Sequence, residues 1–255
     1  MTKNVLELWH GDCLHLMKNI PNESINLVLC DLPYGTTACS WDAVIPFDRL
    51  WIEYKRILTP YSAVVLFGSQ PFTTIMIASN MSWFKYEWVW AKNRPTNFAH
   101  AKNKPMRKHE NICVFSEGTT VHASQSAARM NYFPQGLKPI RQKHERSEKE
   151  NTDVCFSKRK SHGVFVREST GYPHSILEFS TQQLGIHPTA KPVLLLEYLI
   201  KTYTRIGETV LDNCMGSGSA GIAALNTQRG FVGIEKDNHY FDVAEKRINS
   251  WEPVK

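Results

Sequence analysis

Four consecutive residues, Asp31-Leu32-Pro33-Tyr34, bring together a carboxylate, a proline-stiffened carbonyl and an aromatic ring where the apolar run Ile25–Cys30 stops. Two hydrogen-bond acceptors that favour a pyramidal nitrogen would make a ring-bound, delocalised amine more nucleophilic, while an aromatic face holds the ring itself. Pro33 biases Leu32 toward an extended backbone and so aims its carbonyl. The same residues also form an ordinary turn after a strand, so this segment alone leaves both interpretations open.

A second apolar strand ends at Asp212 and opens into a glycine loop and a helix of small residues. Gly216, Gly218 and Gly221 spell the dinucleotide-binding G-x-G-x-x-G, with Glu235 at the end of the next strand as a ribose acceptor. Only a short tail follows that strand, however, and phosphate recognition does not need Asp212 before the loop. S-adenosylmethionine carries an amino acid, a ribose and an adenine but no phosphate, and it suits this loop better.

Three motifs, in this order, resemble those of amino-group DNA methyltransferases. Residues 31–34 are similar to the D-P-P-Y catalytic motif, His187-Pro188-Thr189-Ala190-Lys191-Pro192 to the H-P-T-x-K-P segment, and residues 212–218 to the D-P-F-x-G-S-G cofactor loop. The order is that of the beta class, whose members often open with a strand ending in Gly-Asp, as Gly11-Asp12 does here. The resemblance covers roughly residues 4–117 and 174–248. It departs from the family at Leu32, which replaces a proline, and at Asn213-Cys214, which replace Pro-Phe.

The resemblance implies an α/β, Rossmann-like fold of the S-adenosylmethionine-dependent methyltransferases: a mostly parallel twisted sheet with helices on both faces, permuted motif order and an irregular basic insertion. Residues 1–116 would form the catalytic half, residues 117–172 a target-recognition insertion, and residues 173–255 the cofactor-binding half. Alternating strand and helix signals agree with this fold. We expect helices over residues 47–58, 71–80, 192–200 and 240–248, and strands over residues 25–30, 63–67, 86–90, 111–115, 210–212 and 231–235.

The implied activity is transfer of a methyl group from S-adenosylmethionine to N6 of an adenine flipped out of duplex DNA at a specific short sequence. Members with Asp first in the catalytic motif usually methylate adenine. N4-cytosine methylation, methylation of RNA or of a protein amide, and a non-catalytic nucleic-acid-binding protein remain as alternatives. The expected catalytic residues are Asp31, Leu32, Pro33 and Tyr34, and the expected cofactor-binding residues are Asp12, Thr189, Lys191, Asp212, Cys214, Gly216, Ser217, Gly218 and Glu235.

Two basic segments are candidates for DNA contact. Residues 138–160 hold eight Lys or Arg against four acids, interleaved with aromatic residues, which suits phosphate contact but equally describes a solvated loop. A smaller cluster begins at Lys92 and follows a strand at the same expected edge as Tyr34; an exposed loop is the alternative there. The expected DNA-binding residues are Arg94, Asn97, Lys138, Arg141, Lys143, Lys158, Arg159 and Lys160.

Composition agrees with these expectations. The 255 residues are 42% hydrophobic, enough for one sizeable α/β domain with an insertion, and the formal net charge of +6 favours a polyanionic partner. The six cysteines include no C-x-x-C pair, so we expect buried thiols and no metal site. With no signal peptide apparent, the expected location is the cytoplasm of a bacterial or phage-infected cell. Besides duplex DNA, a second copy of the chain and a cognate restriction enzyme are candidate partners.

Overall fold

The computed structural model describes residues 5–35, 43–122, 126–145, 164–181 and 190–253. The chain divides into two compact units. The first combines residues Met1–Phe133 with Ser175–Lys255, and the second is Pro134–His174.

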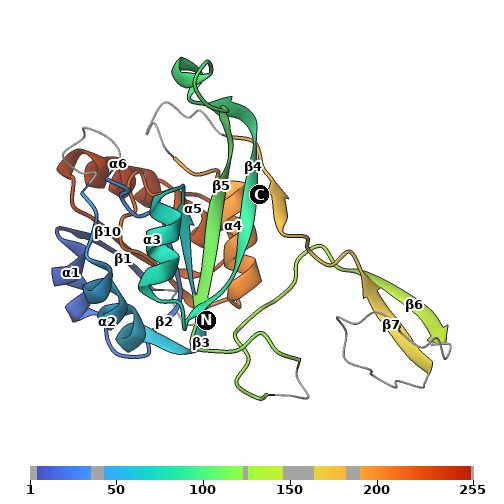
Figure 1. Cartoon of the computed structure of the whole chain (residues 1–255). Coiled ribbons are helices and arrows are strands. Elements are labelled where there is room, and N and C mark those ends of the chain that lie inside the picture. The colour runs from blue at the N-terminus through green and yellow to red at the C-terminus, as the bar shows by residue number, and fades with distance from the viewer. Residues whose placement is uncertain (1–4, 36–42, 123–125, 146–163, 182–189, 254–255) are drawn as a thin grey trace. The chain divides into compact units, whose positions relative to one another are not determined.

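The first unit is built on an eight-stranded sheet in the order β1-β10-β9-β2-β3-β5-β4-β8 (Figure 1). Only β5 runs antiparallel to its neighbours, β3 and β4. The carboxyl ends of the other strands therefore share one edge of the sheet. The bounds are β1 Leu6–His10, β2 Ile25–Cys30, β3 Leu58–Gly68, β4 Phe84–Thr96, β5 Arg107–Ser116, β8 Ile176–Glu178, β9 Thr209–Asp212 and β10 Gly230–Glu235.

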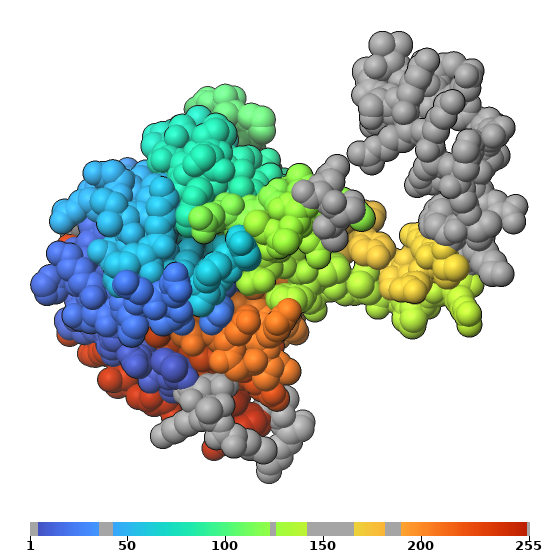
Figure 2. Space-filling model, turned by 90° about the horizontal axis from the view of Figure 1, so that it is seen from below, coloured from blue at the N-terminus to red at the C-terminus, as the bar shows by residue number. Residues whose placement is uncertain are grey.

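Helices cover both faces of this sheet, which explains why its central strands are apolar on both sides. Alternate residues of β2 show this: Leu27 and Leu29 pack with α4 and α5, whereas Val28 and Cys30 pack with α2. One layer holds α1 Cys13–Leu16, η1 Met17–Asn19, α2 Phe47–Ile57 and α3 Phe72–Ser79, and the other holds α4 Val193–Tyr203, α5 Ser219–Asn226 and α6 Asn238–Asn249. Figure 2 looks onto the side opposite the carboxyl-end edge, where the blue and cyan segments with α1 to α3 and the orange segment with α4 reach the surface.

The expected helices and strands are present, but β3 begins five residues before the expected start at residue 63 and β4 continues six residues beyond the expected end at residue 90. In α2 an apolar stripe through Leu50, Tyr54 and Ile57 is fully buried, and basic residues fill the last turn, where the helix dipole favours them. The helix ends at Ile57 because the next residue, Leu58, already begins β3. The sequence did not indicate β8, a three-residue strand, or the short helix η2 Phe98–His100 between β4 and β5.

The second unit contains two regular elements in a region where the sequence pattern indicated none. Strands β6 Lys138–Glu145 and β7 Val164–Thr170 form an antiparallel pair. Both are largely polar, so they lack the apolar alternation that identifies a half-buried strand. The preceding residues belong to the first unit, where Met130 is buried and the Phe133 N–H donates to the Thr202 carbonyl at 2.7 Å.

None of the helices that the structure describes is long and apolar enough to cross a membrane.

Candidate active site

The turn that carries Asp31 is anchored by its neighbour. Asp31 follows β2, which lies between β9 and β3 near the middle of the sheet. The Leu32 side chain is 3% exposed and packs among the apolar residues beneath α2. The leucine that replaces the family's proline therefore holds the turn by packing, while Asp31 and Tyr34 remain half-buried and reachable.

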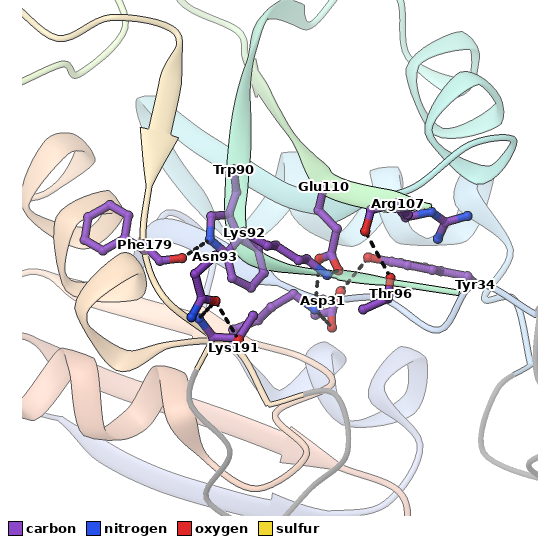
Figure 3. A network of polar contacts seen from close by, with 11 residues as sticks. Asp31, Tyr34, Trp90, Lys92, Asn93, Thr96, Arg107, Glu110, Phe179 and Lys191 are labelled. Atoms are coloured by element: carbon purple, nitrogen blue, oxygen red, sulfur yellow. Dashed lines mark hydrogen bonds and ion pairs between the residues drawn. The ribbon is translucent and has the colours of Figure 1, made fainter. Parts of the chain in front are cut away.

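Both carboxylate oxygens of Asp31 are held by other side chains (Figure 3). Oδ1 accepts a hydrogen bond from the Tyr34 hydroxyl at 2.7 Å, and Oδ2 accepts one from the Lys191 ammonium. The Tyr34 ring in turn stacks on Phe72, with ring centroids 4.7 Å apart. Carboxylate and aromatic ring are thus fixed relative to each other, and one face of the ring already has an aromatic partner.

Asp31 is the end of a row of four alternating charges. Lys191 Nζ also lies 3.5 Å from Glu110 Oε2, and Glu110 Oε1 accepts a hydrogen bond from Lys92 (Figure 3). The side chains of both lysines are only 9% exposed. Burial alone would raise the pKa of Glu110, but the ammonium groups of Lys191 and Lys92 lower it below its ordinary value. Burial would lower the pKa of Lys191, yet Asp31 and Glu110 raise it, so this lysine stays protonated.

The resemblance implies that Lys191 is a cofactor ligand, and in the structure its ammonium pairs with the Asp31 carboxylate. Strand β8 pairs with β4, and the chain after it is tied to β4 where the Trp90 indole donates to the Phe179 carbonyl at 2.8 Å. Glu110 was not singled out at all. Its signal was present, because it is the only acid between residues 88 and 116 in an otherwise basic stretch.

The glycine loop follows β9 at the same edge of the sheet. Asp212 is 6% exposed, and burial raises the pKa of its carboxyl to about 7. Gly216 and Gly218 have φ values of 51° and 76°, a backbone region that glycine adopts without strain. A side chain at Gly218 would also meet Ile248 and Ala244 of α6. The loop therefore keeps the backbone bare beside a buried carboxyl.

Glu235, expected to meet a ribose, also holds this loop in place. Its Oε2 accepts from the Gly216 N–H and its Oε1 from the Asp237 N–H, both at 2.8 Å. Ser217 is buried, and its carbonyl accepts from Arg247 at 3.0 Å. These supporting bonds join the loop to the end of β10 and to α6, and no sequence pattern indicates them.

The residues that replace the family's Pro-Phe form a polar layer under the loop. The Tyr54 hydroxyl donates to Asn213 Oδ1 at 2.7 Å. The Asn213 amide also lies 3.7 Å from Cys13 Sγ and 3.6 Å from Cys214 Sγ. The hydrogen bond with Cys214 and then burial raise the pKa of the Cys13 thiol. For Cys214 the hydrogen bond with Cys13 lowers the pKa, but the hydrogen bond with Cys30 and burial outweigh it, and both thiols are free. Cys214, a predicted cofactor ligand, is half-buried and lies against this layer.

Four acidic residues follow four adjacent strands along the edge. Asp12 follows β1, Glu235 ends β10, Asp212 ends β9 and Asp31 follows β2. Asp12 is the most open of them, capping α1 through the Leu14 N–H at 3.1 Å. S-adenosylmethionine offers an ammonium, a sulfonium, ribose hydroxyls and an adenine amine, all of which favour acceptor oxygens. A row of acceptors beside a bare glycine loop fits such a molecule. Thr189, another predicted cofactor ligand, lies outside the described residues.

The predicted DNA-binding residues fall on both units. Arg94 and Asn97 are exposed on the hairpin formed by β4 and β5, in the first unit. Lys138 and Arg141 are exposed on β6 in the second unit. Lys143 lies in β6, with its side chain outside the described part, and Lys158, Arg159 and Lys160 fall outside the described residues altogether. The described residues contain no cluster of side chains that could hold a metal ion.

Comparison with known proteins agrees with this geometry. The sequence profile of the N6/N4 DNA methylases, described as "DNA methylase", matches residues 25–246. The type II methyltransferase M.HinfI of Haemophilus influenzae is 26% identical over 95% of this chain and 68% of its own length. The type II methyltransferase M2.LlaDCHI of Lactococcus lactis subsp. cremoris is 24% identical over 95% of this chain and 88% of its own length.

Solved structures confirm the expected fold. M1.HpyAVI in complex with S-adenosylmethionine superposes with a TM-score of 0.64 at 22% identity, covering 96% of this chain and all of that one. The cytosine-N4-specific PvuII DNA methyltransferase gives a TM-score of 0.64 at 16% identity, covering 99% of this chain and 89% of that one. Since the profile match spans most of the chain, this protein belongs to the N6/N4 DNA methylase family.

Proposed function

We propose that this protein transfers a methyl group from S-adenosylmethionine to the exocyclic N6 of an adenine in duplex DNA, at a short specific sequence. The observation that carries the proposal is the Asp31 carboxylate at the end of β2, oriented by Tyr34 and Lys191 one strand away from the glycine loop. An aspartate first in the catalytic motif favours adenine over cytosine. The structural likeness to the cytosine-N4-specific PvuII DNA methyltransferase keeps cytosine as the second candidate.

Asp31 and the Leu32 carbonyl act on the amine. Each carboxylate oxygen has two lone pairs, so Asp31 can accept hydrogen bonds from the amine while keeping those from Tyr34 and Lys191. Acceptors aligned with the pyramidal nitrogen stabilise the transition state more than the planar ground state. The nitrogen loses a proton once it has gained the methyl group, and Asp31 is positioned to accept it. No covalent link between enzyme and base is needed.

Tyr34 holds the base. One face of its ring is stacked on Phe72, so the base stacks on the other face. A base inside a duplex cannot reach a tyrosine at a sheet edge, and the target nucleotide is therefore extruded from the helix. Stacking on the ring offsets part of the unstacking cost.

On the cofactor side, Asp212 and the backbone of Gly216 and Gly218 bind the methionine end, Glu235 accepts from the ribose hydroxyls, and Asp12 meets the adenine amine. Bound there, S-adenosylmethionine supplies a methyl group activated by its sulfonium charge. Asp212 carries most of the recognition of the methionine end, because pairing with the ammonium offsets the free-energy cost of burying its carboxylate. Lys191 acts through Asp31 in this scheme, since its ammonium is already engaged there.

The test is direct. Purified protein is incubated with duplex plasmid and S-adenosylmethionine, and the DNA is digested to nucleosides for mass spectrometry. We expect N6-methyladenine with the wild type and none with Asp31→Ala. N4-methylcytosine would keep the mechanism and overturn the choice of base.

A calorimetric titration with S-adenosylmethionine controls for misfolding. Asp31→Ala should bind the cofactor with an affinity close to that of the wild type, because Asp31 contacts the base rather than the cofactor. Loss of binding would contradict this division of labour. Methyl transfer to RNA in preference to duplex DNA, measured by competition for methyl label, would overturn the assigned substrate.

A further inference from the structure

The tip of the β4–β5 hairpin carries an apolar side chain exposed to solvent. Phe98 is 82% exposed, the most exposed of the large apolar residues in the described part of the chain. Its backbone nonetheless forms a turn that hydrogen bonds close. Asn97 adopts a left-handed conformation with φ 69°, and η2 closes through hydrogen bonds from the His100 N–H to Asn97 and from the Ala101 N–H to Phe98, at 3.1 and 3.0 Å. The turn therefore presents the Phe98 ring to solvent, where it is available to a partner.

The charge around Phe98 identifies the kind of partner. Residues 92–109 contain six Lys or Arg and no acid, and this excess equals the formal net charge of the whole chain. Lys92 is neutralised by Glu110, whereas the other five are at least partly exposed and can meet a polyanion at the tip. These five are Arg94, Lys102, Lys104, Arg107 and Lys108. An exposed aromatic ring within a purely basic segment suits nucleic acid.

The tip projects from the same edge of the sheet as the catalytic turn. Thr96 pairs with Arg107 in the outermost rung of the hairpin, and Figure 3 shows both beside Tyr34 and Asp31. The strands below this rung reach Asp31 through Lys92, Glu110 and Lys191. In Figure 1 the green segment between β4 and β5 stands beyond the ends of the neighbouring strands. A duplex whose target base reaches Tyr34 therefore has this tip against it.

We propose that Phe98 is a wedge that enters the base stack next to the extruded nucleotide, while the surrounding lysines and arginines bind the flanking phosphates. This inference rests on the proposed base extrusion. Extruding a base loses its stacking and leaves a gap that water fills poorly. Apolar side chains inserted between base steps compensate for such losses in other DNA-binding proteins. The Phe98 ring fills the gap and lowers the free energy of the extruded state.

The test varies the cost of extrusion. Phe98→Ala removes the ring and Phe98→Trp keeps an aromatic face. Ile206→Ala is the matched control, because Ile206 is 70% exposed and lies before β9, at the opposite edge of the sheet. Each variant is assayed for kcat/KM on a duplex containing the mapped target, once with its normal partner base and once with an abasic site opposite the target.

We expect Phe98→Ala to lower kcat/KM on the paired target by about 10- to 100-fold, the equivalent of about one base stack. On the target opposite an abasic site the loss should be within about threefold, since no base pair has to be broken and extrusion costs less. Phe98→Trp should stay close to the wild type, and Ile206→Ala should change neither rate. An equal loss on both substrates, or no loss on the paired one, would overturn the wedge.

A second readout does not depend on methyl transfer. Plasmid is relaxed by a topoisomerase in the presence of the protein, because an inserted wedge changes the twist of the duplex. The shift in linking number should appear with the wild type and fall with Phe98→Ala. A Phe98-dependent shift in linking number without any methylation would overturn only the proposed function. A methylation rate that does not depend on Phe98, together with no shift in linking number, would overturn only the wedge.

Discussion

At the scale of single residues, the orientation of the Asp31 carboxylate is fixed before any substrate arrives. Tyr34 and Lys191 each hold one oxygen of Asp31, and one of these partners is 160 residues away in the sequence. Pre-formed hydrogen bonds of this kind reduce the reorganisation needed in the transition state. The activity should therefore depend on residues that stabilise Lys191 and never touch the base.

Glu110→Gln tests that dependence. The substitution leaves Lys92 and Lys191 buried with one negative charge fewer, so we expect unfolding to become easier by on the order of 3 kcal/mol. The kcat should fall while the affinity for S-adenosylmethionine is largely kept. Urea unfolding and single-turnover methylation measure the two effects.

Lys201→Gln is the control for that measurement. It breaks a surface ion pair with Glu197 in which the lysine is 43% exposed, and such pairs contribute about 0.5 kcal/mol or less. If Glu110→Gln lowered the free energy of unfolding as little as Lys201→Gln, the buried row of charges would have no stabilising role.

The raised pKa of Asp212 predicts a pH dependence of cofactor binding. Burial raises the pKa of its carboxyl to about 7, so in the free protein it is largely neutral at pH 6 and ionised at pH 8. An ammonium partner binds the ionised form, and affinity should therefore rise as the pH goes from 6 to 8. Calorimetry should show proton release on binding below pH 7, and Asp212→Asn should flatten the profile.

The same pKa has the opposite consequence for the stability of the free protein. The folded pKa lies above the ordinary value of 3.8, so between these values the native state binds more protons than the unfolded state. This group's contribution to stability therefore falls as the pH rises toward 7. An affinity for S-adenosylmethionine that declined from pH 6 to 8 would contradict the assignment of Asp212 to the ammonium.

The sequence identified Asp31 and Asp212 because each stands directly at the end of an apolar run, where a strand must stop. It did not identify the partner of Lys191. That contact depends on the sheet order, with β4 and β5 placed beyond β3, and on β8 tying the returning chain to β4. No local spacing encodes such an arrangement.

At the scale of elements, helices with a buried stripe and fully buried strands were predictable from their periodicity. Strand β8 has three residues and depends on β4 for its hydrogen bonds, so it leaves no periodic signal. Within the residues that the structure describes, strands β6 and β7 pair only with each other, and both are largely polar. The glycine loop after β9 depends instead on positive φ values and on hydrogen bonds to distant residues.

Gly218→Ala should damage that element in two ways. Its φ of 76° strains any side chain, and a Cβ would lie 2.9 Å from Ile248 Cδ1 and 3.1 Å from Ala244 Cβ. We expect a loss of stability of about 1–3 kcal/mol together with weaker cofactor binding. Thermal unfolding and calorimetry measure both.

Gly207→Ala separates strain from contact, because Gly207 has a φ of 84° and a Cβ added there would have no neighbouring atom within 4 Å. It should show only the backbone penalty, with cofactor affinity unchanged. Equal effects of the two substitutions would show that the contact with α6 is unimportant.

At the scale of the whole molecule, the two chain segments at the start and the end of the second unit lie close together in space. A Cβ on Gly171 would lie 2.6 Å from the Gly136 carbonyl oxygen, so the two backbones almost touch. Removal of residues 137–170 therefore leaves two ends that a Gly-Ser link can close. The first unit keeps its whole sheet and both helical layers after this excision.

We expect the excised protein to fold and to bind S-adenosylmethionine with an affinity within about twofold of the wild type, because its sheet edge is unchanged. Methylation of the mapped site should fall by at least about tenfold. The slope of log K against log salt for DNA binding should also become shallower, by about one for each phosphate contact removed.

Lys138→Gln combined with Arg141→Gln in the full chain distinguishes charge from recognition. Loss of these exposed charges on β6 should lower the salt slope while leaving the preference for the target sequence intact, since phosphate contacts carry no base information. An excised protein that still methylated only the mapped site would place target recognition in the first unit. The β4–β5 hairpin would then be the element to examine, because it is an exposed basic segment of the first unit.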